Sequence, residues 1–271
     1  MSSDAPPATR PLIIEFIGIP GAGKTTLARE LVEILRERGI AAATVVDAAR
    51  GGASRTHLGR AAARAAPRSL RSGLLWQVFY VLGALNAVAF GRERLRLVRT
   101  VLGAQLRRPI SAGTKRHIVF WFLQLGGRYR LLMETARDGE AVVIDDGFLH
   151  RCVHLSASHI EAPDPAWVRT YVDLLPKPDL VIHPAAEQAL CARRVLERGV
   201  WRHSRHLSRA EIHSYLTNAG RAVQLAVERA RKRGWLVLTV DNGGRSLDEV
   251  RYDLTRGLGP LLAAVDRESL V

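Results

Sequence analysis

The sequence predicts an α/β fold, a doubly wound parallel sheet of five strands with an enlarged helical insertion between the second and third strands. Two observations support this prediction. Short, continuous apolar segments alternate with longer helical stretches along the 271 residues, and such strands are typical of parallel sheets that are buried on both faces. Four of these segments end on a glycine or an aspartate, and ligands of such sheets bind at the carboxyl ends of the strands.

The first expected strand, residues 12–17, is short, apolar and rich in β-branched residues, and it ends at Gly18. An apolar stripe then predicts a helix over residues 26–38, which Gly39 ends. The remaining strands are expected at residues 43–46, ending on Asp47; at 141–144, ending on Asp145; at 180–182; and at 236–240, ending on Asp241.

The length permits one large domain, and we expect a single domain over residues 1–271 that begins with a disordered arm, residues 1–11. The formal net charge of +14 is compatible with nucleic acid, anionic lipid or a phosphorylated ligand. No nucleic-acid-binding motif accompanies the charge, so nucleic acid is disfavoured as a partner. Cys152 and Cys191 lie in apolar segments, which favours core thiols, and no signal-peptide pattern is present; we therefore expect a cytoplasmic protein.

A phosphate-binding motif follows the first expected strand. The pattern G-x-x-x-x-G-K-[ST] is matched by Gly18-Ile19-Pro20-Gly21-Ala22-Gly23-Lys24-Thr25, with a strand before it and a helix after it. The glycines let the backbone wrap around phosphates, and the helix N-terminus adds positive potential. Lys24 is expected to contact the β- and γ-phosphates of ATP, and Thr25 to offer its hydroxyl to Mg²⁺. The expected nucleotide-binding residues are Gly18, Pro20, Gly21, Ala22, Gly23, Lys24, Thr25 and Thr26.

Two adjacent acids follow the third expected strand. Side chains of neighbouring residues diverge at a strand end, so Asp145 and Asp146 are expected to have different roles. Asp145 is placed to hold the metal with Thr25, and Asp146 to orient or deprotonate an acceptor hydroxyl. The alternative for Asp146 is a turn that caps the following helix. Asp47 is a further candidate base, again with a turn as its alternative.

The helical segment between the second and third strands, residues 53–140, holds eight of the 16 aromatic residues. Within it, residues 73–90 approach the length of a membrane-spanning helix. A span there would place Lys24 and Asp145 on opposite sides of a bilayer, whereas one active site needs both. We therefore expect a buried helix, with peripheral contact at a membrane surface as the alternative.

The motifs resemble the thymidylate-kinase-like branch of the P-loop nucleoside and nucleotide kinases. The likeness covers most of the chain: the phosphate loop, the strand ending in Asp145, and Val240-Asp241. It also includes Lys177-Pro178-Asp179-Leu180-Val181-Ile182 and a helix that ends in Arg193-Arg194-Val195-Leu196-Glu197-Arg198-Gly199. In that family, the Arg-rich segment after the fourth strand is a lid that closes over ATP. The resemblance implies a lid over residues 193–208, and its expected arginines are Arg193, Arg194, Arg198, Arg202 and Arg205.

Within this lid, the resemblance implies that Arg194 and Arg198 act in catalysis and that Arg194 and Arg202 bind the nucleotide. The alternative is a solvated, Arg-rich turn. The sequence departs from the family on the acceptor side: Asp145-Asp146 stands where relatives carry Asp-Arg, and Asp47-Ala48-Ala49 where they carry Glu-Pro-Gly-Gly. The family's ATP-binding motifs are therefore present in this chain, whereas its motifs for binding the nucleotide acceptor are not. The residues 53–140 are expected to form part of the acceptor pocket.

Four histidines were considered as metal ligands. His150 and His154 lie four residues apart on an expected helix, and His203 and His206 lie in the expected lid. No third ligand is evident at a suitable spacing, so a zinc site is disfavoured.

The sequence thus predicts an ATP- and Mg²⁺-dependent phosphotransferase that moves the γ-phosphoryl group to a small, hydroxyl-bearing acceptor, such as a nucleoside-like molecule. The alternatives left open are a thymidylate or other nucleotide kinase, a lipid- or sugar-directed kinase, and a non-catalytic nucleotide switch. A GTPase switch needs an [NT]-K-x-D motif, and Pro176-Lys177-Pro178-Asp179 lacks its first residue. The sequence leaves open which acceptor is used and which carboxylate is the base. It also leaves open the oligomeric state, with a homodimer as one alternative.

Overall fold

The computed structural model describes residues 11–65, 67–108, 110–136, 139–199, 207–259 and 261. Residues 1–10 of the expected N-terminal arm lie outside this part of the chain. So do Arg202, Arg205, His203 and His206 of the expected lid.

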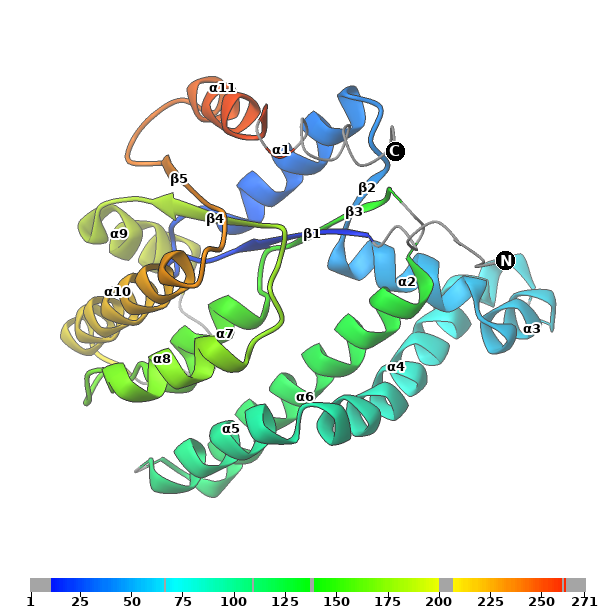
Figure 1. Ribbon diagram of the computed structural model, residues 1–271, viewed down its shortest axis with the longest axis horizontal. Coiled ribbons are helices and arrows are strands. Elements are labelled where there is room, and N and C mark those ends of the chain that lie inside the picture. The colour runs from blue at the N-terminus through cyan, green and yellow to red at the C-terminus, as the bar shows by residue number, and fades with distance from the viewer. Residues whose placement is uncertain are drawn as a thin grey trace, which may run out of the picture.

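A five-stranded, all-parallel sheet organises the molecule, which confirms the predicted α/β fold (Figure 1). The strand order is β2-β3-β1-β4-β5, so β1 (Leu12–Phe16) lies in the centre. Ile14 of β1 is in register with Val143 on one side and Leu180 on the other. The other strands are β2 (Ala42–Thr44), β3 (Ala141–Ile144), β4 (Leu180–Ala185) and β5 (Val237–Asp241).

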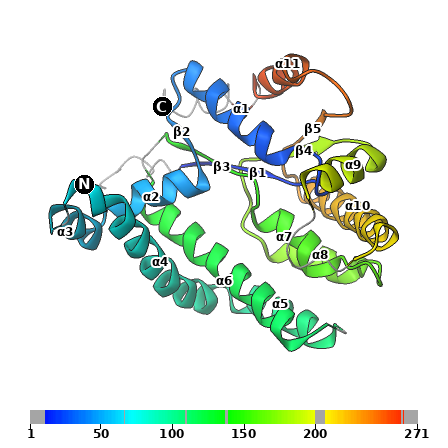
Figure 2. The ribbon, with the colours of Figure 1, turned by 180° about the vertical axis from the view of Figure 1, so that it is seen from behind.

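Helices cover both faces of the sheet, because its strands are apolar on both sides. On one face, α1 (Lys24–Glu37) and α11 (Leu247–Gly257) bury their apolar stripes against the strands. On the other face lie α7 (Phe148–Ser156), α8 (Pro165–Leu174) and α10 (Arg209–Lys232). The view from behind shows the same two layers (Figure 2). After β4, the chain forms α9 (Gln188–Arg198).

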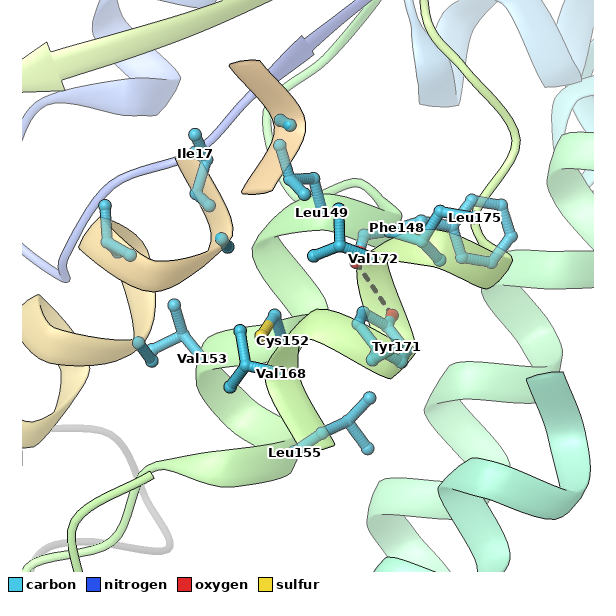
Figure 3. Packing of buried hydrophobic residues seen from close by; sticks show 14 of the residues in the cluster. Ile17, Phe148, Leu149, Cys152, Val153, Leu155, Val168, Tyr171, Val172 and Leu175 are labelled. Atoms are coloured by element: carbon cyan, nitrogen blue, oxygen red, sulfur yellow. Dashed lines mark hydrogen bonds between the residues drawn. The ribbon is translucent and has the colours of Figure 1, made fainter. Parts of the chain in front are cut away.

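A tightly packed core holds α7 in place beneath the sheet (Figure 3). The Tyr171 hydroxyl of α8 donates a hydrogen bond of 2.8 Å to the carbonyl oxygen of Phe148. Cys152 is buried in the same core, and burial raises the pKa of its thiol to about 12. Cys191 is buried as well, and both cysteines are free, as the sequence predicts.

The second strand ends at Thr44 and not at the expected residue 46. Asp47, a candidate base, therefore does not follow the strand directly. Thr44 is the N-cap of α2 (Val45–Arg55), and its side chain accepts a hydrogen bond from the Asp47 backbone N–H. Asp47 therefore lies in the first turn of a helix and not at a strand end. Its carboxylate accepts a hydrogen bond of 2.8 Å from the Thr44 hydroxyl, an arrangement typical of helix capping.

The segment between β2 and β3 is helical, and its longest members lie side by side and extend away from the sheet (Figures 1 and 2). The helices after α2 are α3 (His57–Ala65), α4 (Arg68–Glu93), α5 (Leu95–Arg107) and α6 (Ala112–Thr135).

The apolar run in α4 is only partly buried, in contrast to the buried helix that the sequence predicts. Val78, Phe79 and Phe90 are buried in the cores below it. Leu85 and Val88, in contrast, are 64% and 59% exposed. In the described part of the chain, one helix, Ser69–Glu93, is long and apolar enough to cross a membrane by length and composition.

Candidate active site

The phosphate loop connects β1 to α1, as predicted, and two glycines shape it. Gly21 and Gly23 have φ values of 87° and 88°, in the left-handed region that glycine adopts without strain. A side chain at Gly21 would collide with the Cys191 carbonyl oxygen, and one at Gly23 with the Asn242 amide. These positions therefore need glycine both for their conformation and for their close neighbours.

Helix α1 begins at Lys24, and its N-terminus is oriented toward the loop. Its N-cap is Gly23, which has no side chain to satisfy the first backbone N–H groups. Unpaired N–H groups and the helix dipole make such an N-terminus an anion-binding position.

The Lys24 ammonium is held inside the loop. It donates hydrogen bonds to the carbonyl oxygens of Gly18 and Ile19, at 2.9 and 3.2 Å. Burial lowers the Lys24 pKa to about 8, although Asp146 and Asp145 raise it in part. A partly desolvated ammonium interacts more strongly with an entering phosphate than a solvated one does.

Thr25 and Asp145 meet across the two central strands, as the sequence predicts. The Thr25 hydroxyl donates a hydrogen bond of 2.8 Å to the Asp145 carboxylate. β1 and β3 are neighbours in the sheet, so the loop after β1 lies beside the residue that follows β3. A hydroxyl and a carboxylate oxygen are the hard donors that Mg²⁺ prefers, so these two residues fit the predicted metal.

Other parts of the chain hold the phosphate loop from outside. The Asn242 side chain, which follows β5, donates a hydrogen bond of 2.8 Å to the Ala22 carbonyl oxygen. Its backbone N–H donates to the Ala185 carbonyl oxygen at the end of β4. Arg194 of α9 donates to the Gly21 and Asn242 carbonyl oxygens, at 3.3 and 3.5 Å. Asn242 was not singled out from the sequence, where only Asp241 before it marked the strand end.

A cavity of about 570 Å³ lies over the loop and brings most of the predicted site residues together. Pro20, Gly21, Gly23, Lys24, Thr25 and Thr26 line it, as do Asp145, Asp146, Arg194, Arg198, His150 and His154. Of the other two predicted loop residues, Ala22 is fully buried, and Gly18 accepts a hydrogen bond from Lys24 through its carbonyl oxygen. Asp47 is not among the lining residues; it lies in the first turn of α2 and not at the strand end where the sequence places it. Arg202 lies outside the described residues.

Asp146 lines the cavity beside Lys24 and does not cap the next helix. The N-cap residue of α7 is Gly147, and no side-chain hydrogen bond caps this end of the helix. Arg151 donates a hydrogen bond of 2.7 Å to Oδ2 of Asp146, whereas Oδ1 is buried and has no hydrogen-bond partner. His150 Nε2 lies 4.0 Å from this Oδ1 atom. Asp146 is therefore the third possible ligand beside His150 and His154 that sequence reasoning did not find.

Glu15, a buried acid in the middle of β1, was also missed. Its side chain lies at the N-terminus of α7 and accepts the N–H groups of Phe148 and Leu149, at 3.4 and 3.0 Å. Burial raises the Glu15 pKa to about 7, against the lowering effect of these two hydrogen bonds. Glu15 thereby connects the strand that leads into the phosphate loop with the helix that carries His150 and His154.

Comparisons with known proteins add no family name. No protein-family model matches the chain, and no curated protein matches it. Among solved structures, the chain is similar to a deoxyadenosine kinase from M. mycoides with bound dCTP, at 11% identity and a TM-score of 0.45. The match covers 92% of this chain and 100% of that one. A likeness of this degree carries no argument about activity or substrate.

Proposed function

We propose that this protein is an ATP- and Mg²⁺-dependent phosphotransferase that transfers the γ-phosphoryl group to a small, hydroxyl-bearing acceptor. The main support is one cavity that joins a glycine-shaped phosphate loop, the buried Lys24 ammonium and the Thr25–Asp145 pair to a second acid, Asp146. Phosphoryl transfer needs positioning and charge neutralisation at the moving group, and this set of residues offers both.

Each group has a distinct role in this proposal. The loop backbone and the α1 N-terminus bind the phosphates, and Lys24 exchanges its bonds to the loop carbonyls for bonds to phosphate oxygens. Thr25 and Asp145 hold Mg²⁺, which neutralises phosphate charge when bound. Arg194 and Arg198 line the same cavity and add positive charge beside the transferred group. Asp146 lies on the acceptor side.

A non-catalytic GTP-dependent switch is less well supported. Its guanine-reading motif would have to include Asp179, but the Asp179 carboxylate accepts the Ile13 backbone N–H at 2.7 Å. Asp179 is thus engaged in anchoring β1 at the opposite end of the strand from the phosphate loop.

The surroundings of Asp146 favour a neutral acceptor over a nucleoside monophosphate. The carboxylate forms an ion pair with Arg151 at 2.7 Å, so an acceptor phosphate would have to compete with Asp146 for that guanidinium. If the phosphate took that guanidinium, Asp146 would be left uncompensated and would repel it. We therefore expect a hydroxyl-bearing acceptor such as thymidine to be phosphorylated in preference to dTMP, and efficient turnover of dTMP alone would contradict this.

The decisive test of the proposed activity is a comparison of two lysines. Lys24→Ala should reduce phosphoryl transfer from ATP by about 10³-fold or more, because one phosphate-neutralising charge is lost. Lys115→Ala is the matched control, since Lys115 is partly exposed on α6, does not line the cavity, and donates a hydrogen bond to the Leu106 carbonyl oxygen of the neighbouring helix α5. Turnover would be measured on a broad panel of nucleosides, nucleotides, sugars and lipid alcohols. Near-normal turnover in folded Lys24→Ala would refute the proposal.

A lipid-linked alcohol at an anionic membrane is a second candidate acceptor. It is supported by the exposed apolar residues of α4, such as Leu85, beside a run of exposed arginines, a combination suited to an anionic lipid surface. These arginines are Arg92, Arg94, Arg96 and Arg99.

This membrane contact has its own test. Leu85→Glu should abolish sedimentation with phosphatidylglycerol vesicles, whereas Ile160→Glu should not, because Ile160 is equally exposed but lies after α7, outside the helical insertion. Absence of wild-type binding, or a dimer that forms through this face in place of lipid binding, would contradict the membrane contact.

A further inference from the structure

We infer that Asp146, His150 and His154 form a binding site for a divalent transition-metal cation of the Zn²⁺ type, separate from the Mg²⁺ position at Thr25 and Asp145. His150 and His154 lie one turn apart on α7, so their side chains share one face of the helix, and Asp146 lies two residues before its first residue. One ligand atom from each lies within 4.8 Å of the other two. No other such cluster of histidine, cysteine and acidic residues occurs in the described part of the chain.

The geometry needs little adjustment to hold an ion. Ligands about 2.0–2.1 Å from a tetrahedral cation lie about 3.3 Å apart, and His150 Nε2 is 4.0 Å from Asp146 Oδ1. This pair must approach by about 0.7 Å, and the other pairs, which lie within 4.8 Å, by at most about 1.5 Å; side-chain rotation can supply movements of this size. The two imidazole rings already lie against each other, with centroids 5.1 Å apart.

An unsatisfied polar atom points independently to a missing ligand. The His150 side chain is 4% exposed. Its Nδ1 atom has no hydrogen-bond partner, but a cation bound at Nε2 would leave that nitrogen unpaired, so the supporting atom is the one on Asp146. Asp146 Oδ1 is likewise buried without a partner. Buried polar atoms without partners cost free energy, and they are explained when an ion, water or ligand occupies the site.

The charges nearest to the site balance one another. Arg151 and Lys24 lie nearest, and Asp145 and Asp146 offset these two positive charges with two negative ones. Arg194 and Arg198 also line the cavity and leave it net positive, so the cation must be held by direct coordination to its ligands. Two imidazoles with one carboxylate form a ligand set that suits Zn²⁺, Co²⁺ or Fe²⁺ and disfavours Mg²⁺, which prefers oxygen.

The site opens onto the cavity that holds the phosphate loop, because all three residues line it. Three protein ligands leave a coordination position for a water molecule or an acceptor oxygen. A hydroxyl bound there would lose its proton more readily. Asp146 would then act as a ligand of the cation, and the cation would activate the acceptor hydroxyl. Cation binding itself does not depend on the proposed kinase activity.

The test uses Co²⁺ as a probe on the full-length protein without nucleotide. We expect one equivalent of Co²⁺ to bind, with a visible absorption band of a nitrogen-ligated ion and no displacement by millimolar Mg²⁺. His154→Ala, a partly exposed position, should weaken this binding by at least about 100-fold, because loss of supporting residues outside a ligand set already costs up to that much. His213→Ala is the control, since His213 is exposed on α10.

Two further variants separate the neighbouring acids. Asp146→Asn should weaken Co²⁺ binding, and Asp145→Asn should leave it intact. The inference is overturned if no stoichiometric binding occurs, if His154→Ala binds normally, or if Asp145→Asn alone abolishes the signal. Because the readout is metal binding, a failure here leaves the kinase test with Lys24→Ala unaffected.

Discussion

Glu15 should make the stability of this protein depend on pH in a way that can be calculated from its surroundings. Its folded-state pKa of about 7 exceeds its ordinary value of 4.5. Between these two pH values, the folded protein keeps a proton that the unfolded chain releases. Glu15 therefore contributes most to stability below about pH 4.5, and this contribution is lost as the pH rises through about 7. The difference corresponds to about 3 kcal/mol.

Glu15→Gln isolates this effect. The amide has no proton to lose and keeps one oxygen acceptor for the N–H groups of Phe148 and Leu149. Any cost of the unmatched amide N–H₂ group is independent of pH. We expect the free energy of unfolding of the wild type to fall by about 2.5 kcal/mol more than that of Glu15→Gln between pH 5 and pH 8, because part of the effect is already lost below pH 5.

Urea unfolding at pH 5, 6, 7 and 8 measures this difference. Glu33→Gln is the control, because the Glu33 side chain is 56% exposed on α1, and its profile should parallel that of the wild type. Parallel profiles for the wild type and Glu15→Gln would refute the reasoning, since they would show that burial does not keep Glu15 protonated.

Three further predictions concern the site. Gly23→Ala should lower both thermal stability and nucleotide affinity, whereas Gly39→Ala, at a similar φ of 79° with open space around it, should lower only stability; equal nucleotide affinity in both variants would contradict this. Nucleotide affinity should fall by up to about tenfold per pH unit above pH 8, where the Lys24 ammonium loses its proton, and calorimetry from pH 7 to 9.5 would show no such fall in Lys24→Ala. Asp47→Ala should lower the free energy of unfolding by about 0.5 kcal/mol through its lost contact with Thr44 but leave turnover unchanged; a large loss of turnover would restore Asp47 as a base.

The sheet and the phosphate loop could be predicted from the sequence because their signals are local. Apolar strands and the spacing of Gly18, Gly23 and Lys24 need no knowledge of the rest of the chain. The true position of Asp47 in a helix had a local signal too: Thr44 stands three residues before an acid, the pattern that begins a helix. Val45 and Val46, which lie between Thr44 and Asp47, are apolar and β-branched, and this favoured the prediction of a strand over that of a helix start.

Other features depend on which elements meet in space. Glu15 interrupts an apolar strand, but only the packing of α7 beneath β1 shows what its carboxylate binds. The spacing of Asp146, His150 and His154 is visible in the sequence, but an acid that follows a strand predicts a base or a helix-capping turn before it predicts a metal ligand. Hydrophobicity alone does not reveal that, within the described part of the chain, one face of α4 is left exposed.

The hydrogen bonds around Asn242 determine how a nucleotide would meet the phosphate loop. Through this residue and Arg194, the loop is attached to the ends of β4 and β5 and to α9 before any ligand arrives. A loop that is already shaped loses little conformational entropy on binding. Most of the attraction between the loop and the phosphates should therefore appear directly as affinity, and association should proceed in a single kinetic step, without a slow rearrangement of the loop.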